Sequence, residues 1–248
     1  MNQTGSSRSS LVLVIASYAH YQSNSHLVLL AVRLLTLLCP VTLRSVNGAS
    51  RQNTHRQPSL VAYLGTNGPA FRTALLQRLA DRREHEKLRI AILELITAAL
   101  ESQTGLAELF LQLEDTADGD IPKTIGKQSC LYVILHLLSD KQNLLKRQPR
   151  LVASATAMLH ALWMAGSEHY SVLCTLRRND DFWKRLLAPL QYAPPQRIDP
   201  TARLVADECY RLAAMEGAFQ VLSLEIFSLR RGNQLAAPLT EQLRKLST

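Results

Sequence analysis

Residues 85–103 read HEKLRIAILELITAALESQ, and this stretch decides the fold class. Between Ala91 and Glu101 the polar side chains are Glu94, Thr97 and Glu101. At 100° per residue in an α-helix these three fall within roughly 60° of one another, so the rest of the circumference is apolar. A helix with so narrow a polar stripe must be covered by neighbours on several sides. The stretch therefore predicts an inner helix of a layered, all-helical array.

The same periodicity recurs along the chain, and leucine supplies most of it. Leucine accounts for 46 of the 248 residues, whereas Phe, Trp and Tyr together number only 14. Leucine loses little rotamer freedom in a helix, while strands favour β-branched and aromatic residues. Apolar residues at spacings of i, i+3, i+4 and i+7 then predict helices near 11–22, 26–39, 59–64, 69–83, 85–103, 106–113, 130–138, 152–163, 180–190, 200–229 and 238–247.

Several helix starts carry recognisable terminal residues. Pro69 is suitably placed for a first helical turn, where its missing N–H costs nothing. Asn179 or Asp180 can act as the N-cap of the next helix. Asp199 followed by Pro200 is a good N-cap and first helical residue for the long last helix.

The long last helix admits two interpretations. Its apolar residues alternate three- and four-residue spacings, and we expect them to form one seam: Val205, Leu212, Met215, Phe219, Leu222, Ile226 and Leu229. A coiled coil would use such a seam. Gly217 and the short length of the repeat instead favour an antiparallel helix pair inside a solenoid, because a glycine weakens a free helical rod.

The predicted fold is therefore all-α, an irregular α-solenoid of HEAT- or armadillo-like helical pairs. About five or six such pairs fit, since one pair takes about 40–47 residues. We expect residues 1–25 to hold a polar N-terminal tail, disordered over 1–10, and a first short helix. The solenoid segment then covers 26–248. A polar loop or insertion should interrupt it at 42–58, where apolar periodicity is lost.

The charge distribution is uneven along the chain. The net charge is +8, and no acidic residue precedes Asp81. Such a basic half can mark a nucleic-acid surface. Its arginines are nevertheless scattered among apolar runs without aromatic residues for base stacking. We therefore expect a solvated basic face and no direct contact with nucleic acid.

Other targeting and covalent features are weak. The apolar runs at 11–16 and 27–39 fall short of the roughly 20 residues that a transmembrane helix needs, so they read as core helices. The four cysteines have no short paired spacing, which predicts free thiols and a reducing compartment. Cys130 and Cys209 fall on apolar helical stripes, where a free cysteine packs as a small hydrophobe.

Catalytic and metal-binding patterns leave little trace. The chain has no phosphate-binding glycine loop, no nucleophile elbow and no zinc-protease motif. The acidic stretch at 114–120 lacks the ligand spacing of a calcium loop. His136 and His160 lie in apolar helices, where a partly buried histidine is expected, and Glu94 and Glu101 fit a solvated stripe. We therefore predict a non-enzymatic chain with no cofactor, no metal and no catalytic residue.

Several sequence blocks resemble the C-terminal half of the nucleoporin 188 family. The longest is RIAILELITAALESQTGLAELFLQLE at 89–114, which combines a long apolar helix, a Glu-x-Gln-x-Gly turn and a Leu-x-Glu-Leu-Phe-Leu helix. Shorter blocks follow the family's order over roughly 26–247, at 64–65, 71–72, 129–131, 159–163, 181–184 and 224–227. The family passes more directly between helices where this chain has 42–58. The family chain is also several times longer, so we expect this sequence to be a fragment.

The resemblance implies a superhelical scaffold in the inner ring of the nuclear pore, at the nuclear envelope. Such a scaffold supports nucleocytoplasmic transport, both protein import and RNA export. Its implied partners are other nucleoporins, whose linker helices would lie in apolar grooves, and also Phe-Gly repeats or transport receptors. No residue of this chain is assigned to those contacts. The alternative is a HEAT-like adaptor or a karyopherin-like carrier for soluble partners, although a carrier should be acidic on its concave face.

Overall fold

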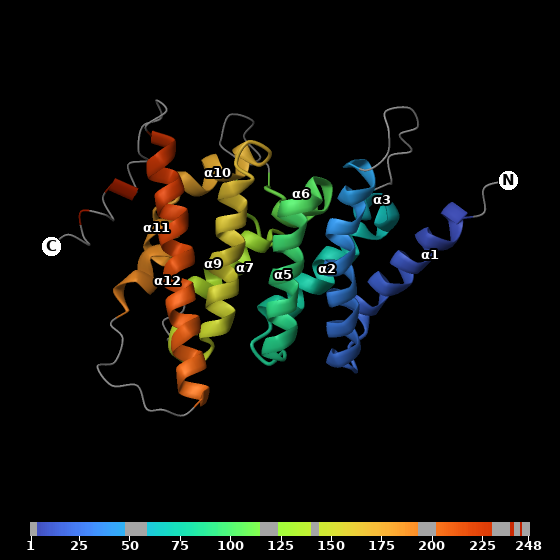
Figure 1. Ribbon diagram of the computed structural model, residues 1–248, viewed down its shortest axis with the longest axis horizontal. Coiled ribbons are helices and arrows are strands. Elements are labelled where there is room, and N and C mark those ends of the chain that lie inside the picture. Colours follow the sequence, from blue (N-terminus) through green and yellow to red (C-terminus); the bar gives the residue numbers. More distant parts are fainter. Residues whose placement is uncertain are drawn as a thin grey trace. The chain divides into compact units, whose positions relative to one another are not determined.

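A computed structural model describes residues 4–47, 59–114, 124–139, 144–192, 202–229, 239–240 and 244 (Figure 1). Within these ranges the chain is all-α, as predicted, and the only extended pairing is an isolated antiparallel bridge between Glu114 and Thr124. The chain divides into two compact units, Met1–Gln112 and Leu113–Thr248.

The first unit is built around two long helices, α2 and α5, that lie side by side (Figure 1). Helices α4 and α6 also pack against α5, while α1 packs against α2 and α3. In chain order the elements are α1 (Thr4–Ser17), η1 (Tyr18–His20), α2 (Ser25–Asn47), α3 (Leu60–Leu64), η2 (Gly65–Asn67), α4 (Gly68–Ala80), α5 (Glu86–Ser102) and α6 (Thr104–Leu111).

Helix α5 confirms the narrow polar stripe. Its start is capped by the His85 side chain, whose Nδ1 accepts a hydrogen bond from the Lys87 N–H at 3.1 Å. Glu94 and Glu101 are exposed. Ten residues on the remaining circumference are buried: Leu88, Arg89, Ile90, Ala91, Ile92, Leu93, Leu95, Ile96, Ala99 and Leu100. The helix is therefore an inner element with neighbours on most sides.

The first two helices are longer than the sequence predicted. Helix α1 begins at Thr4, although disorder was expected over 1–10, because a helix formed over its apolar end extends at little further cost. Helix α2 continues through Pro40 to Asn47 and so takes up 42–47 of the expected loop. The amide of Gln103 donates to the Cys39 carbonyl at 3.0 Å, which holds α2 from outside just before this proline. The rest of the expected loop, 48–58, lies outside the described residues.

The second unit is organised by α9 and α12, which pack along each other (Figure 1). Its elements are α7 (Cys130–Leu138), α8 (Leu144–Arg147), α9 (Pro149–Met164), α10 (Tyr170–Arg177), α11 (Asp180–Leu187), η3 (Ala188–Gln191) and α12 (Ala202–Leu229). The stripes predicted on α7 and α9 are buried, except that Leu138 is half-buried. Asn179 caps α11 as predicted, because its side chain accepts from the Phe182 N–H at 3.0 Å.

Helix α12 packs through a different face from the predicted seam. Val205, Leu212, Phe219 and Ile226 are exposed. Leu222 of the seam is buried, and the other buried positions of the helix are Glu208, Ala214, Gly217, Ala218, Val221 and Glu225. Small residues allow α12 to approach α9 closely, and a Cβ at Gly217 would lie only 2.7 Å from Thr156 Oγ1. Four residues of the predicted seam are therefore exposed, whereas Leu222 is buried and Met215 is half-buried, so the seam describes the core only in part. The glycine that weakens a free rod is a packing requirement.

Candidate interaction surfaces and buried polar contacts

Potential metal ligands do not gather in the part of the chain that the structure describes. No group of three or more His, Cys, Asp or Glu residues there could hold a metal ion. None of the described helices is long and apolar enough to cross a membrane. His160 is half-buried as expected, but His136 is exposed because it lies on the side of α7 away from the apolar stripe.

The cysteines divide into core and surface positions. Cys39 and Cys130 are fully buried, and burial raises the pKa of each thiol to about 12. Neither thiol ionises near neutral pH, so both pack as small hydrophobes. Cys209 is exposed, contrary to the prediction, because α12 turns a different face to the core.

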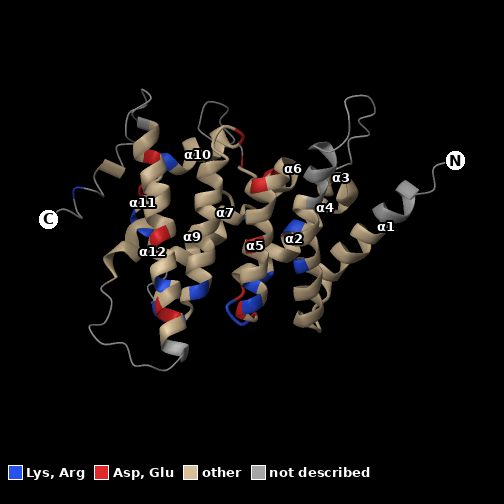
Figure 2. Cartoon of the chain, viewed as in Figure 1, with Lys and Arg blue, Asp and Glu red and all other residues tan. Residues whose placement is uncertain are grey.

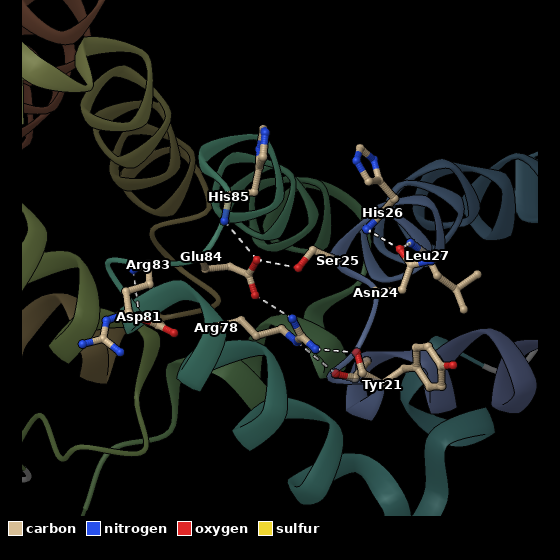
Figure 3. A network of polar contacts seen from close by, with 11 residues as sticks. Tyr21, Asn24, Ser25, His26, Leu27, Arg78, Asp81, Arg83, Glu84 and His85 are labelled. Atoms are coloured by element: carbon tan, nitrogen blue, oxygen red, sulfur yellow. Dashed lines mark hydrogen bonds and ion pairs between the residues drawn. The ribbon is translucent and has the colours of Figure 1, made fainter.

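A network of polar contacts joins the start of α2 to the turn between α4 and α5 (Figure 3). The Arg78 guanidinium forms an ion pair with Glu84 at 2.6 Å and donates to the Tyr21 carbonyl, also at 2.6 Å. Ser25 donates to the second oxygen of Glu84 at 2.8 Å. Partial burial alone would raise the pKa of Glu84, but hydrogen bonds from the His85 N–H, Ser25 and Arg78, together with the charge of Arg78, lower it below its ordinary value. The network therefore favours the ionised carboxylate.

Gln103 connects four helices, α2, α3, α5 and α6, at the corner between α5 and α6. Its side chain is buried, and its amide N–H₂ donates to the Cys39 carbonyl of α2 at 3.0 Å. Its amide oxygen accepts from the Leu60 N–H at the start of α3, at 3.3 Å. The backbone of Gln103 ends α5 and precedes α6. One buried amide therefore holds this corner in place.

Two arginines of the basic first half, Arg72 and Arg78, make contacts inside the first unit. Arg72 is buried and donates to the Gln112 side chain and the Leu109 carbonyl. Arg78 belongs to the network above. Figure 2 shows Lys and Arg spread over separate helices. Those described arginines that are bound internally are not available to an external polyanion.

Two glutamates of α12 are buried in the core of the second unit, where most side chains are apolar. Glu225 accepts from the Trp163 indole N–H at 3.1 Å and pairs with Arg177 at 2.9 Å. Glu208 accepts from the Tyr192 hydroxyl at 3.1 Å and pairs with Arg211 at 2.8 Å. Hydrophobic periodicity missed both contacts, since Trp163 and Arg177 lie far from Glu225 in the sequence and Tyr192 lies well before Glu208.

Trp163 also belongs to a packed aromatic cluster. Its ring stacks on Phe182 with a centroid distance of 5.3 Å, and Trp183 meets both rings edge-on. The cluster is buried between α9 and α11. It explains two of the blocks in which the sequence resembles a known family, at 159–163 and 181–184, as core packing.

Two helices carry exposed apolar stripes. On α12 the stripe consists of Val205, Leu212, Phe219 and Ile226, one residue every seven. On α2 it consists of Leu30, Leu34 and Leu37, and Leu37 is 67% exposed. Scattered surface leucines would not line up along one face of a helix as these residues do. Such lines of apolar side chains are typical of helix faces that pack against another helix.

Comparison with known proteins identifies what the chain resembles. Residues 5–114 match a family model described as Nucleoporin Nup188, N-terminal subdomain III. The whole chain is 32% identical to nucleoporin NUP188 of Homo sapiens and 33% identical to that of Xenopus tropicalis. Nucleoporin Nup188 of Drosophila melanogaster is 25% identical over 75% of the chain.

The alignments also show how small a part of the relatives this chain matches. The chain spans only 13% of the length of the human and Xenopus relatives. The predicted placement in the C-terminal part is not confirmed, since the matched family model is described as N-terminal. The predictions of homology, of a non-enzymatic protein and of its location are confirmed. The chain is therefore homologous to a part of nucleoporin NUP188.

Proposed function

We propose that this chain is a segment of an α-solenoid scaffold in the inner ring of the nuclear pore complex. The observation that supports this proposal most directly is the 32% identity to nucleoporin NUP188, which extends over the whole chain. Residues 5–114 would correspond to N-terminal subdomain III, because that family model matches them. Residues 115–248 would then continue into the helices that follow.

The exposed apolar stripes support the solenoid part of this proposal. A helical repeat buries its apolar face only against its neighbours, so a segment taken from such an array presents apolar faces at the positions of missing neighbours. Helix α2 in the first unit and α12 in the second each have such a face. Linker helices of other nucleoporins are the proposed partners, and support of nucleocytoplasmic transport is the proposed role.

Localisation in cells tests this function. The full-length protein is fused to a fluorescent protein and to a biotin ligase for proximity labelling. We expect a punctate signal at the nuclear rim and labelling of inner-ring nucleoporins. A diffuse signal with labelling of soluble cargo but no inner-ring protein would support the carrier alternative and reject the scaffold.

A further inference from the structure

The second unit contains a cleft that is separate from the buried polar contacts described above. Its volume is about 590 Å³. It is bounded by one face of α7, by the turn between α10 and α11, by α11, and by the segment at 124–125. This volume accommodates a small number of side chains, in the range typical of ligand pockets.

One wall of the cleft is held by an internal ion pair. Arg185 donates to the Leu135 carbonyl in the last turn of α7 at 2.8 Å. Its other guanidinium nitrogen pairs with Asp181 at 2.6 Å, one turn away on α11. These contacts tie α11 to α7, and they neutralise Asp181, the one carboxylate among the described residues that line the cleft.

Three other lining residues keep their donors available. Tyr132, His136 and Arg178 are exposed. Within the described residues, none of their side chains takes part in a hydrogen bond or an ion pair. Arg178 therefore leaves an uncompensated positive charge in the lining, beside a phenol and an imidazole that can also donate. Ile125, which is half-buried, and the Tyr132 ring add apolar surface.

We propose that this cleft binds an acidic segment of a protein partner, with a glutamate or aspartate carboxylate held by Arg178 and a neighbouring leucine-like side chain against Ile125 and Tyr132. A guanidinium holds a carboxylate through two parallel hydrogen bonds, which is the strongest pairing this lining offers. Among the described residues that line the cleft, Arg185 is paired with Asp181 and Arg178 adds a further positive charge, so the charge of this lining is complementary to an acidic peptide. The inference goes beyond the scaffold role and does not depend on it.

Binding of a designed peptide to the purified 248-residue chain tests the inference. The probe is a short fluorescein-labelled helical peptide of glutamate, leucine and alanine, and its counterpart carries glutamine in place of glutamate. Fluorescence polarisation should show tighter binding of the glutamate peptide. Arg178→Glu should weaken that binding about tenfold or more, since it replaces a paired charge by a repulsive one.

Lys184→Glu is the matched control. Lys184 is exposed on α11 but does not line the cleft, and its substitution changes the net charge equally. We expect the Lys184→Glu variant to bind the glutamate peptide with an affinity within about twofold of that of the wild type, because solvent screens an exposed charge outside the site. Equal weakening by the two variants, or equal binding of the two peptides, would overturn the inference. Tighter, Arg178-dependent binding of a single-stranded RNA oligonucleotide would also overturn it in favour of nucleic acid. Circular dichroism spectra of both variants confirm that they are folded.

Discussion

Gly217 shows how a single missing side chain can determine the spacing of two helices. A Cβ at this position would lie 2.7 Å from Thr156 Oγ1 and 2.9 Å from Thr156 Cβ. Real Cβ atoms do not come this close to a backbone-anchored neighbour, so the two helices would have to separate. The conformational cost of a glycine inside α12 is thus offset by the contact with α9.

We predict that Gly217→Ala lowers the free energy of unfolding by about 1–3 kcal/mol, the usual cost of overpacking. Helix propensity alone would predict a gain of about 1 kcal/mol, so the sign of the change distinguishes the two effects. Urea denaturation provides the measurement. Gly105→Ala in α6 is the control, since its nearest neighbour would be 3.9 Å away. A more stable Gly217→Ala variant would contradict the close approach.

The Glu84 carboxylate should make stability depend on pH in the acidic range. Its pKa in the folded chain is lowered, whereas an unfolded glutamate titrates at about 4.3. The folded state therefore holds fewer protons, so this contribution is present above about pH 4.3 and is lost as the pH falls through the lower folded value. Glu84→Gln should be less stable than the wild type at pH 7, and the difference should shrink below pH 4.3. Chemical denaturation across this range measures it, and a constant difference would contradict the network.

At the scale of the helix, periodicity predicted the existence of elements better than their orientation. On α5 a narrow polar stripe left only one possible solvent face, and Glu94 and Glu101 lie on it. Helix α12 has apolar residues on more than one side. Its contact with α9 uses Gly217 and the buried Glu225, and hydrophobic periodicity gives little weight to glycine and glutamate. The sequence pattern therefore selected the large apolar residues, and four of them, Val205, Leu212, Phe219 and Ile226, are exposed.

Substitutions on α5 test its face assignment. Leu93→Asp or Leu95→Asp should cost several kcal/mol, comparable to the stability of a whole domain, because both side chains are fully buried and an aspartate there would lack a partner. Glu94→Gln and Glu101→Gln should change the melting temperature little, since both residues are exposed. Thermal melts followed by circular dichroism compare the two pairs. Similar losses in both pairs would show that the faces are misassigned.

For the whole chain, the all-α class could be predicted because it depends on repeated local spacing. The network around Arg78, the Gln103 corner and the cleft beside Arg178 could not, because each brings together residues far apart in the sequence. Ile125, Tyr132 and Arg178 have no common sequence pattern, and only the packing of α7 against α11 makes them neighbours.

The purified chain should therefore give a far-ultraviolet circular dichroism spectrum dominated by helix. The described residues form α-helices with short 3₁₀ segments and one isolated bridge. We expect double minima near the wavelengths typical of helices and negligible strand signal. A spectrum dominated by strand would contradict both the sequence pattern and the structure.

The Gln103 corner has a mechanical consequence. Its amide touches the backbone of α2 and α3, while its own backbone joins α5 to α6. A pull on α6 cannot be absorbed by bending at this joint alone, because the displaced amide would abandon two hydrogen bonds inside the core. A displacement of one of these helices is therefore transmitted to the other three through Gln103. Loss of this one amide would therefore loosen the contacts of the α5–α6 corner with α2 and α3 at the same time.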